Sequence, residues 1–220
     1  MEKPATTEVP TKTGITLEPT NLHDKTQFDE LLRQRIMCGW ANTPEILETW
    51  REEIDKGTLS FFWIVPSSLS SLSTTDRFAG HISMTARTDD HGNAVQHILS
   101  LFVVPERRSG GLARAAVQTL EGWAKVKPYG RPDCRAMTLN CIHHRYIDDD
   151  SSEEWRPFAI KVYGKLGVPM PDKGTSVQGW YERLGFVKQS QGPMYPTGEY
   201  RDDGTEILFI ECNMRKELPE

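Results

Sequence analysis

The pattern of apolar and polar positions predicts a chain that mixes strands with helices. Short runs that are apolar or alternating, each bounded by polar turns, indicate seven strands. They cover residues 15–18, 59–65, 78–86, a fourth run that ends at Val104, 136–142, 186–189 and 206–214.

Helical spacing of apolar residues predicts two helices after the first strand, over residues 24–38 and 44–56. Thr43 and Pro44 suit the N-cap and the first position of the second helix, and Gly57 suits its end. A third helix follows the fourth strand. Its apolar face consists of Leu112, Ala115, Ala116, Leu120 and Trp123.

Polar segments separate these elements. Residues 1–13 are rich in Thr, Pro and charge, which predicts a disordered tail. Ser and Thr dominate residues 66–76, which predicts a flexible hairpin loop, and residues 89–93 form a clear turn. A polar loop rich in Gly and Pro is expected between the last two strands.

The most informative segment is the apolar run at residues 98–104, followed by a charged turn and a helix of small residues. Glycines at the start of a helix let a phosphate approach the backbone, and the unpaired N–H groups of the first turn hold the anion. Residues 108–113, called the glycine turn below, are therefore a candidate phosphate site. The competing interpretation is an ordinary strand-to-helix turn whose glycines only allow tight packing.

The glycine turn resembles motif A of the GNAT superfamily of acyl-CoA-dependent N-acyltransferases. Arg108, Gly111 and Ala113 match that signature, and Val103 and Pro105 stand where family members usually have Val and Pro. A Walker loop is excluded because no Gly-Lys-Ser/Thr follows, and a Rossmann fingerprint because its three-glycine spacing is missing. The resemblance implies that acetyl-CoA binds here, its pantetheine amides on the backbone of Leu101, Phe102 and Val103 and its pyrophosphate on the N–H groups of Arg108, Ser109, Gly110, Gly111, Leu112 and Ala113.

The same resemblance implies the fold class. We expect an α/β (α+β) GNAT fold in which a mixed, mostly antiparallel sheet of about seven strands is splayed between strands four and five, with helices on both faces. One domain, residues 14–220, would follow the disordered tail.

A second family-like segment lies at residues 177–187, where Tyr181 lies on a predicted helix and Gly185 would end it. The apolar face of this helix consists of Val177, Trp180, Tyr181 and Leu184. The segment resembles the family's Tyr-x-x-x-Gly-Phe motif, whose tyrosine can protonate the departing coenzyme A thiolate. Because a phenol has a pKa of about 10 and a thiol one of about 8.5, this transfer needs a stabilised phenolate or a concerted step. The alternative is that Tyr181 is a half-buried packing residue with a satisfied hydroxyl.

A general base is also required, because an ammonium of pKa about 10 must lose a proton before it attacks a thioester. His97 is the candidate, since it lies on the fourth strand where several GNAT members carry a basic Glu or His, and an imidazole titrates near neutral pH. The other interpretation is a strand-end histidine that faces solvent. His81 and Ser83 are weaker alternatives, and of His143 and His144 at most one would face the pocket, because adjacent strand residues point to opposite sides.

Composition sets limits on the function. With 220 residues, 37% of them hydrophobic and 26% charged, the chain is typical of one globular domain. A net charge of −5 argues against nucleic acid as the main partner. No apolar run suits a membrane span and no secretory signal is seen, so we expect no membrane association and a cytoplasmic location. The four cysteines lack metal-ligand spacing, so we expect no metal and no disulfide.

More residues separate Arg108 from Tyr181 than a minimal GNAT domain needs, which indicates an insertion at about residues 143–173. It holds an acidic run at residues 148–150 and the aromatic Trp155. We expect the insertion to shape the acceptor pocket; a solvated surface excursion is the alternative.

Taken together, the resemblance implies an N-acetyltransferase that transfers the acetyl group of acetyl-CoA to a primary amine by direct attack in a ternary complex. A small-molecule amine is favoured because the insertion would narrow the site, while a protein or peptide acceptor stays open. The rival from another class is a non-catalytic acyl-CoA-binding regulatory module. The question of a homodimer is also open.

Overall fold

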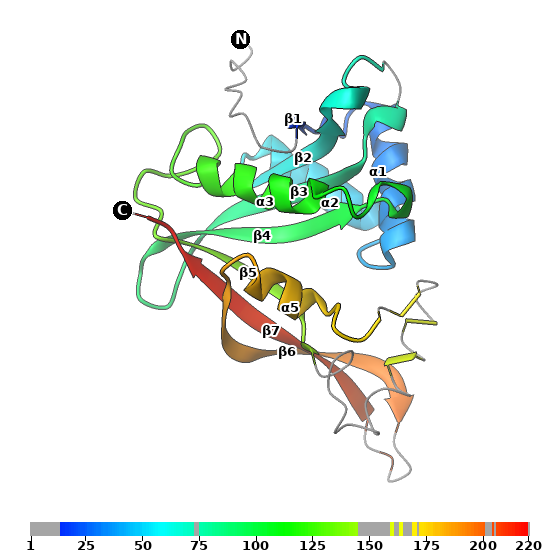
Figure 1. Cartoon of the computed structure of the whole chain (residues 1–220), viewed down its shortest axis with the longest axis vertical. Coiled ribbons are helices and arrows are strands. Elements are labelled where there is room, and N and C mark those ends of the chain that lie inside the picture. The colour runs from blue at the N-terminus through cyan, green and yellow to red at the C-terminus, as the bar shows by residue number, and fades with distance from the viewer. Residues whose placement is uncertain are drawn as a thin grey trace. The chain divides into compact units, whose positions relative to one another are not determined.

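The computed structural model describes residues 14–72, 75–144, 159–160, 163–164, 169–170, 172–200, 204 and 206–219 (Figure 1). The chain divides into two compact units, which are considered separately below. The first comprises Met1–Ile36 and Ala41–Cys134, and the second comprises Met37–Trp40 and Arg135–Glu220. The predicted tail, residues 1–13, and residues 145–158 of the predicted insertion lie outside the described residues.

The first unit is built on four antiparallel strands. Its elements are β1 (Ile15–Pro19), α1 (Lys25–Cys38), α2 (Pro44–Asp55), β2 (Leu59–Pro66), β3 (Gly80–Thr88), β4 (Ala94–Val103) and α3 (Leu112–Trp123). The strands pair in the order β1-β2-β3-β4. These bounds confirm the predicted elements to within about two residues. The predicted hairpin loop after β2 contains two 3-10 turns among its described residues, Ser67–Leu69 and Thr75–Arg77.

Helices cover both faces of this sheet, α2 on one face and α3 on the other (Figure 1). Consecutive residues of β2 pack against them. Phe61 packs against Trp50 of α2, with ring centroids 5.3 Å apart. Its neighbour Phe62 points to the opposite face and packs against Trp123 of α3, also at 5.3 Å. A buried aromatic side chain of this kind contributes roughly 2–3 kcal/mol. Because successive side chains of β2 point to opposite faces, this strand holds α2 on one face of the sheet and α3 on the other.

A tight turn and a bulge shape the pairing of β3 with β4. The Asp89 carboxylate accepts hydrogen bonds from the backbone N–H groups of His91 and Asn93, which closes the predicted turn. Further along, Ser83 pairs with Ser100 and Met84 pairs with Ile98, so Leu99 has no partner on β3. This β-bulge leaves the Leu99 side chain 41% exposed.

The second unit has three described strands and a short helix. Its elements are β5 (Ala136–Ile142), α5 (Val177–Glu182), β6 (Val187–Tyr200) and β7 (Glu206–Glu217). The strands are antiparallel in the order β5-β7-β6. The Ser176 hydroxyl caps α5 by accepting a hydrogen bond from Gly179, and Gly185 follows the helix with a φ of +90°. The helix ends at Glu182, with Arg183 as its C-cap, slightly before the predicted end at Gly185.

The last strands correct the prediction. We expected a strand over residues 186–189 and then a loop, but β6 continues through Pro193 and Pro196 to Tyr200. It is an edge strand of this unit, where the missing N–H of a proline needs no partner. Its register shifts between Gln191 and Met194 and again between Pro196 and Tyr200. Bulges on an edge strand therefore accommodate residues that would interrupt a central strand.

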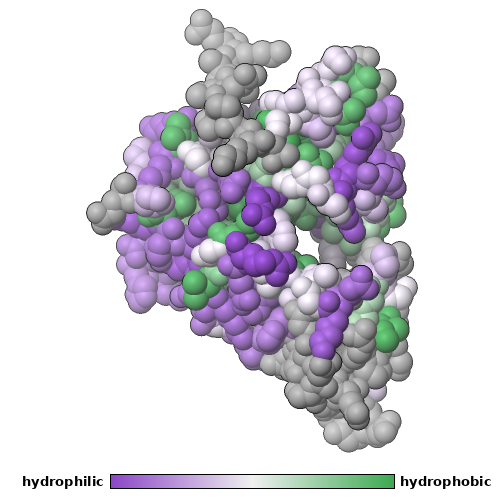
Figure 2. Space-filling view, viewed as in Figure 1, coloured by the Kyte–Doolittle hydropathy of each residue, from purple (hydrophilic) through white to green (hydrophobic). Residues whose placement is uncertain are grey.

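The four strands of the first unit and the three of the second give the predicted total of seven among the described residues. The predicted splay between strands four and five stays a prediction. In the described part of the chain, no helix combines the length and hydropathy needed to cross a membrane. On the face shown in Figure 2, hydrophobic residues form small, separate spots within a mainly hydrophilic surface.

Candidate active site

The glycine turn joins β4 to α3 and has two residues in the left-handed region. After the 3-10 turn Pro105–Arg107, Ser109 adopts a φ of +68° and Gly111, the N-cap of α3, a φ of +75°. Left-handed residues at the start of a helix turn successive N–H groups toward the same side. Ser109 carries a Cβ in a conformation that disfavours one, and such local strain is typical of functional sites.

The N–H groups of the glycine turn are available to an anion. Arg108 N–H donates to the Pro105 carbonyl at 3.2 Å, so it is already used. From Ser109 to Ala113, no N–H group donates to another described residue, and the first bond of the turn into α3 runs from Ala115 to Gly111. Five consecutive free donors at the positive end of a helix dipole fit a phosphate or pyrophosphate.

The Arg108 side chain lies against β4 rather than over these donors. Its Nε donates to the Val103 carbonyl at 3.0 Å, and its guanidinium lies 5.5 Å from the centre of the Phe102 ring. Arg108 therefore fixes the angle at which the chain leaves β4 and contributes positive charge close to the glycine turn.

Residues 101–103 form the end of β4 that leads into the turn. Leu101, Phe102 and Val103 pair with Ile82, His81 and Gly80 of β3, respectively. Phe102 and Val103 are buried, and Leu101 is half-buried. The strand predicted to pair with pantetheine is therefore continuous with the glycine turn.

His97 lies on β4, opposite Thr85 of β3. Opposite residues of antiparallel strands project from the same face, so His97 shares the face that α2 covers. The side chain is 5% exposed, which excludes the solvent-facing interpretation. Burial, followed by the positive charge of Arg87, lowers the pKa of His97 to about 4. The ring is therefore unprotonated at neutral pH, although it is a weaker base than a free imidazole.

The two weaker candidates for the general base, His81 and Ser83 of β3, are hydrogen-bonded to other side chains. His81 is fully buried, with Nδ1 2.9 Å from the Gln34 amide oxygen and Nε2 3.3 Å from the Arg35 guanidinium. Burial, followed by the charge of Arg35, holds the pKa of His81 well below its ordinary value. The Ser83 hydroxyl is hydrogen-bonded to that of Ser100 at 2.9 Å. His81 therefore links α1 to the sheet as a neutral ring.

Tyr181 belongs to the second unit, on α5, and is 6% exposed. Its ring contacts Trp180 and Phe186, with centroids 4.8 and 5.6 Å away. Its hydroxyl makes no hydrogen bond with the described residues, unlike that of a satisfied packing tyrosine. Burial, with a smaller contribution from Cys141, raises the pKa of Tyr181 above its ordinary value. The phenolate is thus disfavoured, which leaves the concerted form of proton transfer.

The apolar face predicted for this helix is partly wrong. Val177 is 40% exposed, whereas Gln178 is buried. The Gln178 amide oxygen accepts a hydrogen bond from the His144 N–H at 3.0 Å.

Of the two adjacent histidines, His143 is buried with Nε2 2.8 Å from the Lys188 ammonium, and His144 is exposed. The two rings thus differ in burial, and whether either faces the acceptor pocket stays a prediction.

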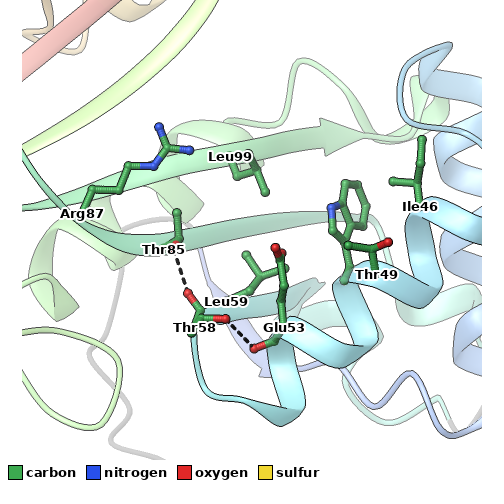
Figure 3. Close-up of a pocket in the computed structure, with 9 residues that line it drawn as sticks. Ile46, Thr49, Glu53, Thr58, Leu59, Thr85, Arg87 and Leu99 are labelled. Atoms are coloured by element: carbon green, nitrogen blue, oxygen red, sulfur yellow. Dashed lines mark hydrogen bonds between the residues drawn. The ribbon is translucent and has the colours of Figure 1, made fainter.

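The sequence did not mark a pocket of about 390 Å³ on the first unit (Figure 3). It lies between α2, the start of β2, the end of β3 and the middle of β4, where it includes the exposed Leu99 of the bulge. Its lining residues are Ile46, Thr49, Trp50, Glu53, Thr58, Leu59, Thr85, Arg87 and Leu99. The continuous apolar run at residues 98–104 hides the register shift that exposes Leu99, so strand periodicity alone could not find this pocket.

Comparison with known proteins now identifies the family. The model of the Acetyltransferase (GNAT) family matches residues 28–146, more than half of the chain. The chain therefore belongs to the GNAT acetyltransferase family, whose enzymes use acetyl-CoA as a cosubstrate. A comparison with curated proteins finds no match.

Solved structures share the fold at low sequence identity. An aminoglycoside 6'-N-acetyltransferase complexed with coenzyme A has a TM-score of 0.56 at 14% identity, covering 93% of this chain and 98% of that one. Arabidopsis thaliana NAA60 with a bisubstrate analogue has a TM-score of 0.54 at 14% identity, covering 93% and 99%. Vibrio cholerae spermidine N-acetyltransferase with CoA and spermine has 0.51 at 13%, covering 94% and 97%. These likenesses confirm the predicted GNAT fold class.

Proposed function

We propose that this protein transfers the acetyl group of acetyl-CoA to the primary amine of a small molecule, by direct attack in a ternary complex. The observation that carries the proposal is the run of free N–H donors at residues 109–113, between the 3-10 turn that follows β4 and helix α3. These donors would hold the pyrophosphate, and the backbone of Leu101, Phe102 and Val103 would pair with the pantetheine amides. Acetyl-CoA supplies the acetyl group as a thioester.

His97 and Tyr181 would handle the protons. His97, unprotonated at neutral pH, would accept a proton from the acceptor amine, directly or through a water. Tyr181 would donate its hydroxyl proton to the departing sulfur as the carbon–sulfur bond breaks. Because burial disfavours a free phenolate, that donation would be concerted with bond cleavage. No covalent acyl-enzyme is required, since the amine is itself the nucleophile.

The acceptor and the cellular setting belong to the same proposal. The solved structures with this fold include enzymes named for spermidine and for an aminoglycoside, and a NatC complex bound to a peptide. A small-molecule amine is supported by the modest volume of the pocket beside the bulge. A protein or peptide acceptor is the alternative, and the cytoplasm is the proposed location.

Calorimetric titration of acetyl-CoA tests the cofactor site. Gly111→Asp places negative charge among the N–H donors, so we expect binding to weaken about 100-fold or more, equivalent to roughly 3 kcal/mol. Gly111→Asn is the steric control, because it adds a side chain of similar shape without charge, and Asn tolerates a positive φ better than most residues. Gly122→Asp on the same helix, where a new Cβ meets nothing within 4 Å, controls for added charge.

If the folded wild-type protein bound no acetyl-CoA, the cofactor assignment to this chain would be lost. Equal loss of affinity in Gly111→Asp and Gly122→Asp would show that the glycine turn is not the site.

A further inference from the structure

Two opposite charges enter the pocket on the first unit from different elements. Glu53 comes from α2, where it shares one helix face with the other lining residues Ile46, Thr49 and Trp50. Arg87 comes from the far end of β3. Figure 3 shows the Glu53 carboxylate directed from α2 toward the strands, and Arg87 on the side away from α2, extended along the strands toward Leu99.

Neither charge has a partner of its own. Among the described residues, the Glu53 carboxylate and the Arg87 guanidinium make no hydrogen bond or ion pair. The neighbouring acids on α2 differ, because Glu48 pairs with Arg51 and Glu52 with Lys56. The Glu53 carboxylate of α2 is therefore available to a ligand.

Arg87 is exposed to solvent near the end of β3, and partial burial lowers the pKa of its guanidinium below the ordinary value. A guanidinium with no anion partner among the described residues is a ready site for a carboxylate, which it can bind through two parallel N–H···O bonds.

The pocket adjoins the strand proposed to carry the thioester end of acetyl-CoA. Leu99 lines the pocket and lies two residues before Leu101 on β4. Thr85, which also lines it, is the register partner of His97. Arg87 lies two residues beyond Thr85, roughly 7 Å further along β3. An acceptor that filled the pocket would thus reach from the bulge toward the guanidinium.

We propose that this pocket binds the acceptor and selects a small amine that also carries a carboxylate, as an amino acid does. Arg87 binds the carboxylate, and Glu53 attracts the ammonium group. Trp50, Leu59 and Leu99 supply apolar surface for the carbon chain between the charges. This inference rests on the proposed acetyl transfer and adds the chemical class of the acceptor.

Matched acceptors test the selection directly. Lysine and 1,5-diaminopentane differ by the carboxylate, as do 6-aminohexanoate and hexylamine. Acetylated product is measured by mass spectrometry and coenzyme A release with a thiol reagent. We expect kcat/KM to be about 10- to 100-fold higher for the member of each pair that carries the carboxylate, the usual range for a charge-assisted hydrogen bond.

Substitutions then test the roles of Arg87 and Glu53 in acceptor binding. Arg87→Gln should remove the preference, so that both members of each pair have similar kcat/KM, and should leave the Kd of acetyl-CoA unchanged. Any change that acts through the pKa of His97 affects both members of a pair alike. Glu53→Gln should weaken both members of each pair. Glu52→Gln, on the outer side of the same helix, is the matched control and should change neither.

The outcomes separate this inference from the proposed function. If the wild-type protein acetylates both members of each pair equally, or if Arg87→Gln leaves their ratio unchanged, the inference is overturned while acetyl transfer stands. If acetyl-CoA does not bind, the proposed function fails. Direct calorimetric titration of lysine and 6-aminohexanoate then still tests whether the pocket binds amines that carry a carboxylate. Binding to the wild type that Arg87→Gln abolishes would support the inference, and no binding would overturn it.

Discussion

At the scale of single residues, His97 shows how its surroundings set the chemistry of a side chain. Burial and the charge of Arg87 lower the pKa of His97 to about 4. Arg87 also lines the pocket, together with Glu53 of α2. A carboxylate bound to Arg87 would therefore move the pKa of His97 back toward its ordinary value.

The lowered pKa predicts a specific loss of stability in acid. An unfolded histidine has a pKa of about 6.5, so between pH 6.5 and 4 the unfolded chain binds a proton that the native His97 does not. The stabilisation is complete above pH 6.5 and is lost as the pH falls toward 4. At pH 5 the loss from His97 is roughly 2 kcal/mol, and the buried His81 acts in the same direction.

Denaturant unfolding of the wild type and of His97→Gln at pH 7.5 and 5.0 measures this effect. The wild type should lose roughly 2 kcal/mol more than the variant between the two pH values. Equal losses in both proteins would show that the native pKa of His97 is not depressed.

The residues of the site were predictable only where a motif marks them. Arg108, Gly111 and Ala113 stand at fixed spacing after an apolar strand, and Tyr181 precedes a Gly-Phe pair. Those positions follow from local backbone chemistry. Glu53 and Arg87 belong to different elements and have no spacing rule, so their meeting depends on the packing of α2 over the sheet.

At the scale of elements, the junction of β3 with β4 sets the geometry of the proposed cofactor site. Gly80 pairs with Val103, and a Cβ added at Gly80 would lie 2.1 Å from the Phe102 carbonyl oxygen and 2.9 Å from the Val103 Cα. Both are backbone atoms of the strand proposed to pair with pantetheine. The glycine is therefore needed for the close approach of the two strands.

Gly80→Ala should consequently affect both stability and cofactor binding. Forcing the backbone of β4 aside is expected to lower the free energy of unfolding by about 1–3 kcal/mol or more and to weaken acetyl-CoA binding. Gly122→Ala is the control, because its Cβ is unobstructed and alanine favours a helix. Thermal unfolding and calorimetry measure both quantities. A Gly80→Ala protein with the stability and affinity of the wild type would contradict the account of this junction.

Elements were predicted well where periodicity and caps agree, as in α2 between Thr43 and Gly57. The prediction was wrong for β6, because the prolines and glycines in this segment predicted a loop. Whether a proline interrupts a strand depends on whether the strand is central or at an edge, which is a property of the sheet and not of the segment. The bulge at Leu99 was missed for a related reason, because register is defined only by the partner strand.

At the scale of the whole molecule, the motif and the order of elements were sufficient for the fold class, which the family match and the solved structures confirm. The acceptor was not predictable in this way, because the fold serves many amines and specificity depends on the residues that line one pocket. The predicted role of the insertion stays a prediction, since residues 145–158 lie outside the described part of the chain.

The central claim is catalysis of acetyl transfer, as opposed to passive binding of acetyl-CoA. Tyr181→Phe removes the proposed acid and should lower turnover about 100-fold or more, with the Kd of acetyl-CoA unchanged. Tyr200→Phe is the matched control, because that tyrosine is 64% exposed and no role is proposed for it.

The most direct measurement is acetylated product and released coenzyme A, quantified together for the wild type, Tyr181→Phe and Tyr200→Phe with lysine, 1,5-diaminopentane, spermidine and a peptide with a free N-terminus. We expect equal amounts of the two products with at least one amine for the wild type and Tyr200→Phe, and slow turnover for Tyr181→Phe. Tight binding of acetyl-CoA by the wild type without acetylation of any of these amines would contradict catalysis and favour a binding module.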